Sequence, residues 1–503
     1  MKKFVLLSLI ALLIMGLAPA VYAQIDFKAY GSLTAGGVMW KNFSGSTGPI
    51  LSPWALRPDA GNGFDRTSNF YSSYANIFFE WNAGKDVRGV FNIETVNYLS
   101  GRNLTGYPPA AEGTEFDTGL WDTRVGETRL RNAYVQFGVP YFGIPVPMTI
   151  SAGVIPMNVR PAFTFSSVNG AGIQWDIKVD PASLSFIWGK MAEGNTWAAD
   201  DSDFYSLEGR VKAGPATIGG YVIFNDMDTY PINYNPVKSS YEADFWWLGL
   251  YADGKMGPLN FNFDFAYDTG KIKARESVFG PGVDDAKYNG WATQLKLAYP
   301  SPWKLTFGLT GMYASGADTK KTSKAGLPGD DVAEPTSTAI TSKVKSFVVP
   351  AGGSQVPWAE SMFLGGHFST LIAIPQQMAY ASPWLTQANR GAIGGTWIAK
   401  LWAGYPVTDA YKVTIWGMYI GDNTKNGNTL GDARKSDGRL RDDKNIGWEF
   451  ALIQDISLYK NLMLTFGAGY LFAGDALDQA VTATTNKSPD NPWILDFKLA
   501  YNF

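Results

Sequence analysis

The chain has 503 residues, a formal net charge of −3 and no cysteine. The small net charge gives no electrostatic basis for binding nucleic acid, and the lack of cysteine excludes a disulfide framework and a thiolate metal site. Aromatic residues make up 15% of the chain, and glycine contributes 55 residues. Aromatic girdles and small residues within strands, which are typical of membrane-spanning β-barrels, would account for both.

The first segment has the pattern of a secretory signal peptide. Two lysines precede an apolar run from Phe4 to Met15, and small residues lie just before Gln24. About twelve apolar residues are too few for a transmembrane helix, which needs roughly 20. We therefore predict that residues 1–23 form a cleaved signal peptide and that residues 24–503 form a single barrel domain.

Apolar and polar residues alternate with a period of two along most of the remaining chain. In the segment 170–191, for example, Trp175 and Ile177 alternate with Asp176 and Lys178. Such segments predict strands at 25–40, 68–82, 87–98, 128–138, 146–155, 170–179, 183–191, 203–213, 216–225, 243–253, 258–268, 288–299, 303–314, 394–405, 411–420, 445–455, 462–472 and 493–503.

The connections between these strands also follow a pattern. Short turns follow the even strands and longer polar segments follow the odd ones, as in a barrel with periplasmic turns and extracellular loops. Downstream of the signal peptide the chain has no run of 18 uninterrupted apolar residues, so membrane crossing requires a closed barrel. The sequence predicts an all-β, transmembrane, antiparallel up-and-down β-barrel of about 18 strands, with 16 or 20 as alternatives.

One connection, residues 314–394, is far longer than the others. Its first part, 316–354, is rich in charged and polar residues and is predicted to be solvated. Its second part contains apolar runs such as Leu371 to Pro375, which predict that it folds against the wall or into the lumen as a constriction. The alternatives are an extra hairpin or a packing segment for a neighbouring subunit.

Charged residues on the polar faces of the predicted strands are the expected lining of the lumen. The predicted pore-lining residues are Arg88, Glu94, Asp176, Lys178, Glu208, Arg210, Lys212, Asp264, Lys296, Lys304, Lys400, Glu449, Asp496 and Lys498. Their charges nearly balance, which predicts weak ion selectivity rather than selection of one ion class. The assignment depends on strand register, because a slip of one residue exchanges the two faces.

Residues that could support catalysis are scarce. The single histidine, His367, lies in a glycine-flanked loop, and neither a Gly-x-Ser-x-Gly elbow nor a metal-spaced histidine pair occurs around it. We therefore expect no enzymatic activity, no cofactor and no metal site.

The last strand, 493–503, alternates most clearly and is long enough to cross a bilayer at a tilt. Its ending, with Tyr501 and the terminal Phe503, resembles the C-terminal assembly signal of bacterial outer-membrane barrels. Together with the signal peptide, the alternating strands and the long loop, it resembles the Gram-negative outer-membrane porin superfamily. The strand number is similar to that of sugar porins, substrate-specific monomeric channels and alginate-export channels. The stretch 129–154 is similar to porins of sulfate- and metal-reducing bacteria.

This resemblance implies a channel that is exported through the periplasm and inserted by the β-barrel assembly machinery. Its expected surroundings are outer-membrane lipid and lipopolysaccharide, with a homotrimer as one assembly, and its expected function is passive diffusion of small hydrophilic solutes and ions. The alternatives are a substrate-specific channel for an oligosaccharide or anionic polymer, and a structural or partner-filled barrel such as a sheath for an electron-transfer protein. Trp402 and Trp416 fall on predicted polar faces, but no motif assigns them the sugar-stacking role of lumen aromatics in sugar porins.

Overall fold

The structure is a computed structural model that describes only part of the chain. The described residues are 25–41, 68–100, 127–139, 147–157, 159–160, 168–192, 201–230, 241–274, 285–320, 343–348, 360–363, 394–480, 482 and 484–503. The predicted signal peptide (1–23), His367 and most of the long connection 314–394 lie outside these residues.

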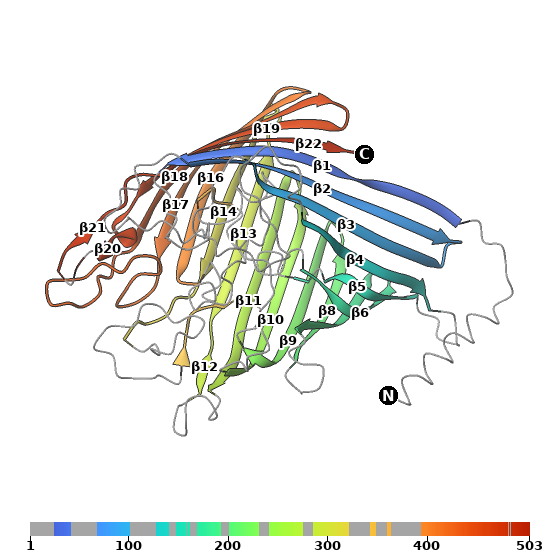
Figure 1. Cartoon of the computed structure of the whole chain (residues 1–503), viewed down its shortest axis with the longest axis horizontal. Coiled ribbons are helices and arrows are strands. Elements are labelled where there is room, and N and C mark those ends of the chain that lie inside the picture. Colours follow the sequence, from blue (N-terminus) through green and yellow to red (C-terminus); the bar gives the residue numbers. More distant parts are fainter. Residues whose placement is uncertain are drawn as a thin grey trace.

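Eighteen long strands pair in antiparallel fashion into one closed wall (Figure 1). They are β1 (Ile25–Lys41), β2 (Ser68–Ala83), β3 (Val87–Ser100), β4 (Glu127–Gly138), β5 (Met148–Met157), β6 (Val168–Val179), β7 (Ala182–Ala192), β8 (Ser202–Ala213), β9 (Ala216–Tyr230), β10 (Tyr241–Met256), β11 (Leu259–Ala274), β13 (Trp291–Pro300), β14 (Thr306–Ala314), β16 (Thr396–Thr408), β17 (Tyr411–Asp422), β18 (Asn445–Tyr459), β19 (Leu462–Ala473) and β22 (Trp493–Asn502). The last strand pairs with the first, from Lys41 against Trp493 to Ser32 against Asn502, and this pairing closes the barrel. The predicted fold class and strand number are confirmed.

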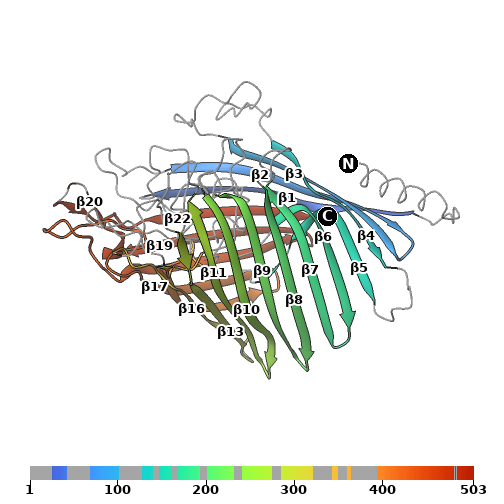
Figure 2. The same ribbon diagram turned by 90° about the horizontal axis from the view of Figure 1, so that it is seen from below.

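The remaining elements belong to the connections. They are β12 (Ala286–Tyr288), β15 (Lys343–Val344), the short 3-10 helix η2 (Asp475–Leu477), β20 (Gln479–Ala480) and β21 (Asn486–Lys487). The strands β20 and β21 lie beyond the wall formed by β17, β18 and β19, at the end of the barrel that carries the longer connections (Figure 1, Figure 2). Within the described part of the chain, no helix is long and apolar enough to cross a membrane.

The short turns at the other end use residues that adopt a left-handed backbone. Gly84, Gly214 and Gly257 have φ angles of 65°, 60° and 60°, a region that glycine enters without steric cost. Lys304 has a φ of 62° in the turn before β14. This irregular backbone delays the strand, so β14 begins at Thr306 instead of at the predicted residue 303, and the predicted pore-lining Lys304 lies exposed in the turn.

The outward face of the wall is apolar and is bounded by aromatic side chains at both ends. Near the loop end, rings on neighbouring strands pack together: the ring centroids of Phe224 and Trp246 are 4.3 Å apart, and those of Trp291 and Tyr313 are 4.6 Å apart. The exposed aromatics near the turn end include Trp303, Tyr405, Tyr459, Tyr501 and Phe503. Two girdles around an apolar band are the arrangement by which a β-barrel fits a bilayer.

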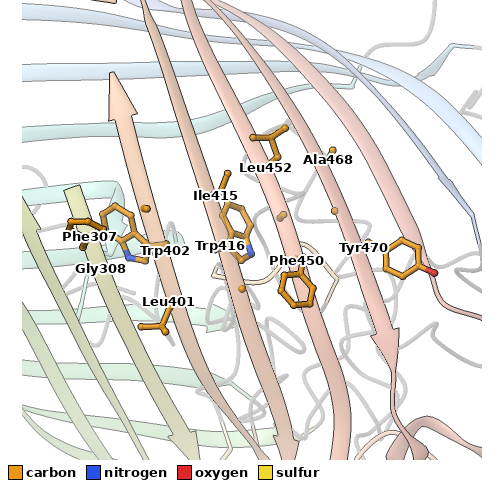
Figure 3. Close-up of a pocket in the computed structure, with 14 residues that line it drawn as sticks. Phe307, Gly308, Leu401, Trp402, Ile415, Trp416, Phe450, Leu452, Ala468 and Tyr470 are labelled. Carbon is orange, nitrogen blue, oxygen red and sulfur yellow. The ribbon is translucent and has the colours of Figure 1, made fainter. Parts of the chain in front are cut away.

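Small residues on this outward face form a shallow apolar depression of about 800 Å³ across β14, β16, β17, β18 and β19 (Figure 3). Its lining includes Leu401, Ile415 and Phe450, which are exposed by 67%, 52% and 49%. Because side chains alternate along a strand, these residues lie on the face opposite to Lys400 and Trp416. Most of its lining therefore faces away from the lumen, and Trp402 and Trp416 of the inward face border it as well.

An outward charge near the middle of the apolar band should destabilise the barrel. Leu401 lies four residues from Trp397, near the loop end of β16, and four residues from Tyr405, near its turn end. Leu401→Arg is expected to cost about 2–4 kcal/mol of folding free energy, because it places a charge in hydrocarbon. Urea titration of folding into lipid vesicles measures this cost. The matched control is Thr414→Arg, which places the same charge on the inward face of β17; an equal loss in both variants would contradict the assignment of the faces.

On the inward face, large aromatic side chains lie over glycines of neighbouring strands. A Cβ atom on Gly249 would stand 1.9 Å from the Tyr221 ring, and one on Gly308 would stand 1.9 Å from the Trp402 ring. The register places each glycine directly opposite its aromatic partner, and Figure 3 shows the Trp402 indole beside Gly308. Glycine in a strand often marks such a close approach. The rings therefore lie flat along the wall.

Candidate functional site

The inward face of the barrel carries the charged residues that the alternation predicts. On β16, the Lys400 side chain points to the face away from its exposed neighbour Leu401. On β18, the Glu449 side chain points to the face away from its exposed neighbours Trp448 and Phe450. By the same alternation, the inward face receives Arg88, Glu94, Asp176, Lys178, Glu208, Arg210, Lys212, Asp264, Lys296, Lys400, Glu449, Asp496 and Lys498. Lys304 lies instead in the turn before β14.

Some of these charges are paired and buried. Glu94 is 1% exposed, forms an ion pair with Arg131 on β4 and accepts a hydrogen bond of 2.8 Å from the Tyr74 hydroxyl. The pairing of β3 with β4 shifts between Asn92 and Ile93, so one extra residue is accommodated on β4. Because of this irregularity, alternation alone does not determine which way Arg131 faces.

Other predicted residues are exposed near the turn end of the lumen. Lys178, Arg210 and Lys212 lie on β6 and β8, and all three are exposed. The Arg210 Nε donates a hydrogen bond of 2.8 Å to the Ser183 hydroxyl. Ser183 lies on β7, the strand between β6 and β8, and is paired with Lys178 on one side and Arg210 on the other. These side chains can be reached by solvent at this mouth of the barrel.

Residues 159–160, which follow β5, reach the wall formed by β10 and β11. The Arg160 guanidinium contacts Asp264, with an N–O distance of 3.1 Å, and also pairs with Asp253. It lies 4.3 Å from the centroid of the Tyr251 ring. Burial would lower the pKa of Arg160, but the Asp264 and Asp253 carboxylates raise it, so this guanidinium is a fixed positive charge.

The long connection between β14 and β16 also returns to the inward wall. The Trp247 Nε1 donates to the Val348 carbonyl at 2.9 Å, and the Val348 N–H donates to Asp268 Oδ2 at 2.7 Å. Phe347 is fully buried. The prediction that residues 316–354 are solvated is therefore wrong for residues 343–348, because their short apolar run packs against β10 and β11.

Residues 360–363 of the same connection contact the wall several strands further on. The two Glu360 carboxylate oxygens bind different lysines: Oε1 lies 2.6 Å from Lys296 on β13, and Oε2 lies 3.0 Å from Lys400 on β16. Lys400 also donates to the Glu360 carbonyl oxygen at 2.8 Å. We call these three residues the lysine clamp.

Glu449 holds the next residues of this segment. Its carboxylate accepts hydrogen bonds from the Ser361 hydroxyl at 2.5 Å and from the Met362 N–H at 2.9 Å. It also accepts one from Trp416 Nε1 at 3.1 Å, and the Lys400 ammonium lies 4.0 Å from the centroid of the Trp416 ring. Trp416 is thus covered by the clamp, so its ring is not a platform for a solute, whereas Trp402 is partly exposed.

The wall beneath the segment provides space for its apolar side chains. A Cβ atom on Gly469 would stand 2.7 Å from the Met362 sulfur and 3.3 Å from the Phe363 ring. Met362 and Phe363 are each 2% exposed. Because a larger wall residue would displace both side chains, Gly469 helps to position residues 360–363 inside the barrel.

Electrostatics favour the ionised form of the clamp carboxylate. Burial alone would raise the pKa of Glu360, but the ammonium groups of Lys400 and Lys296 outweigh this effect and lower it to about 2. The stabilisation from this depressed pKa is present above the ordinary carboxyl pKa and is lost as pH falls toward about 2. The Glu360 carboxylate of the clamp therefore keeps its negative charge at neutral and mildly acidic pH.

Two central residues of the site, Arg160 and Glu360, were not predicted from the sequence. Both lie in connections, where no periodicity relates a residue to a face of the barrel. A charged residue beside a short apolar run was the available signal, because such runs tend to pack against a surface. Among the described residues, no group of three or more His, Cys, Asp or Glu side chains is arranged to hold a metal ion.

No protein-family model and no curated protein sequence matches the chain. Among solved structures, the chain is similar to OccK2 (OpdF) of Pseudomonas aeruginosa in complex with glucuronate, with a TM-score of 0.50 at 9% identity over 95% of this chain and 98% of that one. It is also similar to P. aeruginosa OccK8 (OprE), with a TM-score of 0.49 at 11% identity over 95% and 98%. The P. aeruginosa outer membrane protein OpdK has a TM-score of 0.47 at 8% identity over 95% and 99%.

Proposed function

We propose that this barrel, which has the fold of the Gram-negative outer-membrane porins, is a passive channel for small hydrophilic solutes and ions. The observation that carries the proposal is the division of one closed wall into an apolar outward face and a charged inward face. A barrel of about 18 strands is wide enough to leave an aqueous lumen. Solutes would move down their own gradients without a cofactor or an energy source.

The inward-folded segments would set the width of this channel. Arg160 contacts β10 and β11, residues 343–348 contact the same part of the wall, and residues 360–363 contact β13, β16 and β18. We propose that these segments form the constriction and that the charged residues of the inward face line the path. Lys304 is excluded from this lining because it lies in a turn.

A channel dedicated to one class of solute is the second candidate. It is favoured by the fixed geometry of the inward segments, because hydrogen bonds to buried charges hold them in defined positions. The similar protein OccK2 was solved with glucuronate bound, which makes glucuronate a reasonable first test solute. A solute-specific channel would show a saturable block of its current by that solute.

The expected partners are outer-membrane lipid, lipopolysaccharide and the β-barrel assembly machinery. Tyr501 and Phe503, the proposed assembly signal, are exposed on the outward face by 43% and 42%, and their ring centroids are 6.0 Å apart. The Phe503 main chain exchanges two hydrogen bonds with Gly31, which joins the end of the chain to β1. A homotrimer is the assembly that we propose.

Single-channel recording tests the proposed function. Purified barrels in a planar bilayer under a potassium chloride gradient should give large, steady and weakly selective current steps, in groups of three for a trimer. Glucuronate and neutral sugars are then added to search for saturable block. A correctly folded barrel that passes no current would contradict the channel and favour the structural or partner-filled alternative.

A further inference from the structure

The lysine clamp has the composition of an occupied anion site. Lys296 and Lys400 lie in one row across β13, β14 and β16, each directly opposite Thr310. Neighbouring strands are about 4.8 Å apart, so the Cα atoms of the two lysines are about 10 Å from each other. Their ammonium groups nevertheless converge on one carboxylate. Each oxygen of Glu360 serves a different lysine, which is the way a free oxyanion would present its oxygens.

We infer that Glu360 is a specificity-determining residue that fills a two-lysine oxyanion site and so keeps passing anions from being held at this level of the lumen. The inference rests on the proposed channel function. Two ammonium groups face one carboxylate, so the clamp carries a net charge of +1 at neutral pH. Without the Glu360 charge, the same site would carry +2 and would attract a solute anion.

The two lysines contribute differently to this site. The Lys400 side chain is 6% exposed and is held by the Glu360 carbonyl oxygen and the Trp416 ring as well as by the carboxylate. The Lys296 side chain is 38% exposed, and Glu360 is the partner that the structure gives it. A passing anion would therefore reach the site from the side of Lys296.

Other carboxylates near the segment do not replace Glu360. Glu449 is fully buried, and its oxygens accept hydrogen bonds from Ser361, Met362 and Trp416. These bonds hold residues 361–362 in place independently of the clamp. Neutralising Glu360 should therefore change the charge of the site while leaving a separate attachment for the segment.

The test compares reversal potentials under a potassium chloride gradient for the unmodified protein and four variants. Glu360→Gln is expected to raise the anion-to-cation permeability ratio roughly sixteenfold, because one unit charge about 5 Å from an ion in water changes the partitioning of an anion and of a cation by about fourfold each, in opposite directions. The double variant Glu360→Gln/Lys400→Gln restores the net charge of the unmodified clamp and should return the ratio to the unmodified value. Lys296→Gln reduces the net charge to zero and should shift the ratio toward cations.

Sulfate supplies an independent readout, because an exposed two-lysine site should bind this dianion. Sulfate is expected to block the current through Glu360→Gln at lower concentrations than in the unmodified protein. Asp437→Asn is the matched control and the fourth variant, since it also removes one negative charge but lies in the connection between β17 and β18, where Asp437 pairs with Arg439. It should leave both readouts unchanged.

The outcomes separate the inference from the proposed function. If Glu360→Gln barrels conduct with the same permeability ratio and the same sulfate block as the unmodified protein, the inference is overturned and the channel stands. An equal shift of the permeability ratio in Glu360→Gln and in the double variant would also overturn the inference. The cause would then be the lost anchoring of residues 360–363 rather than the change in charge. If Glu360→Gln fails to fold, an unchanged ratio in Lys296→Gln overturns it. Silent unmodified barrels would refute the channel, and the inference with it.

Discussion

Replacing Glu449 with alanine is expected to release residues 361–363 from the wall and to raise the single-channel conductance. The carboxylate accepts hydrogen bonds from the Ser361 hydroxyl and the Met362 N–H, both buried. Each buried donor left without an acceptor costs about 1–3 kcal/mol, so the docked arrangement should lose about 2–6 kcal/mol. In the released arrangement both donors regain water, and the lumen widens where the segment stood.

Thiol labelling provides a second measurement, because the chain has no cysteine of its own. Phe363 is 2% exposed, so a cysteine placed there should react slowly in the unmodified background and quickly when Glu449 is replaced by alanine. Glu449→Gln is the control, since its amide oxygen keeps one acceptor and should preserve most of the docking. Equal labelling rates with glutamate and alanine at this position would show that Glu449 does not anchor the segment.

Replacing Arg160 with alanine is expected both to destabilise the barrel and to shift its selectivity toward cations. The Asp264 side chain is 1% exposed and lies 3.1 Å from the guanidinium. Removing one partner of such a buried pair typically costs about 3–5 kcal/mol, because the remaining charge is left uncompensated. The Asp253 carboxylate loses its ion-pair partner as well, and the loss of the guanidinium's positive charge from this level of the lumen would favour cations.

Urea titration of folding into vesicles measures the first effect, and the reversal potential in a salt gradient measures the second. Arg160→Lys serves as the control, since it keeps the charge but replaces the planar group that contacts Asp264, Asp253 and the Tyr251 ring together. It should retain the selectivity and lose part of the stability. A barrel of unchanged stability and selectivity in Arg160→Ala would mean that this contact contributes to neither.

The wall of the barrel was predictable because one physical constraint acts on every strand. Each strand separates hydrocarbon from water, so its residues alternate, and the alternation carries both the strand number and the facing of residues such as Lys400 and Glu449. The prediction was wrong where backbone geometry interrupts the alternation, as the positive φ of Lys304 does at the start of β14. Alternation also does not determine the facing of Arg131, because an extra residue on β4 interrupts the pairing there.

The contacts inside the lumen could not be predicted in the same way. Arg160 and Asp264 are 104 residues apart in sequence, and Ser361 and Glu449 are 88 apart. The residues of a connection show no periodic alternation of apolar and polar side chains that would indicate which strand the connection contacts. A single sequence therefore shows which charges face inward, but not which of them are used to hold a returning segment.

The glycines beneath the inward aromatics give the barrel a property that the charged residues do not. Tyr221, Tyr251 and Trp402 each lie over a glycine of the next strand. A methyl group at any of these glycines would lift the ring off the wall and into the path of a solute. The free cross-section of the lumen thus depends partly on glycine positions, which present no side chain. Single substitutions at these glycines would change the width of the lumen and leave every charged residue of the inward face in place.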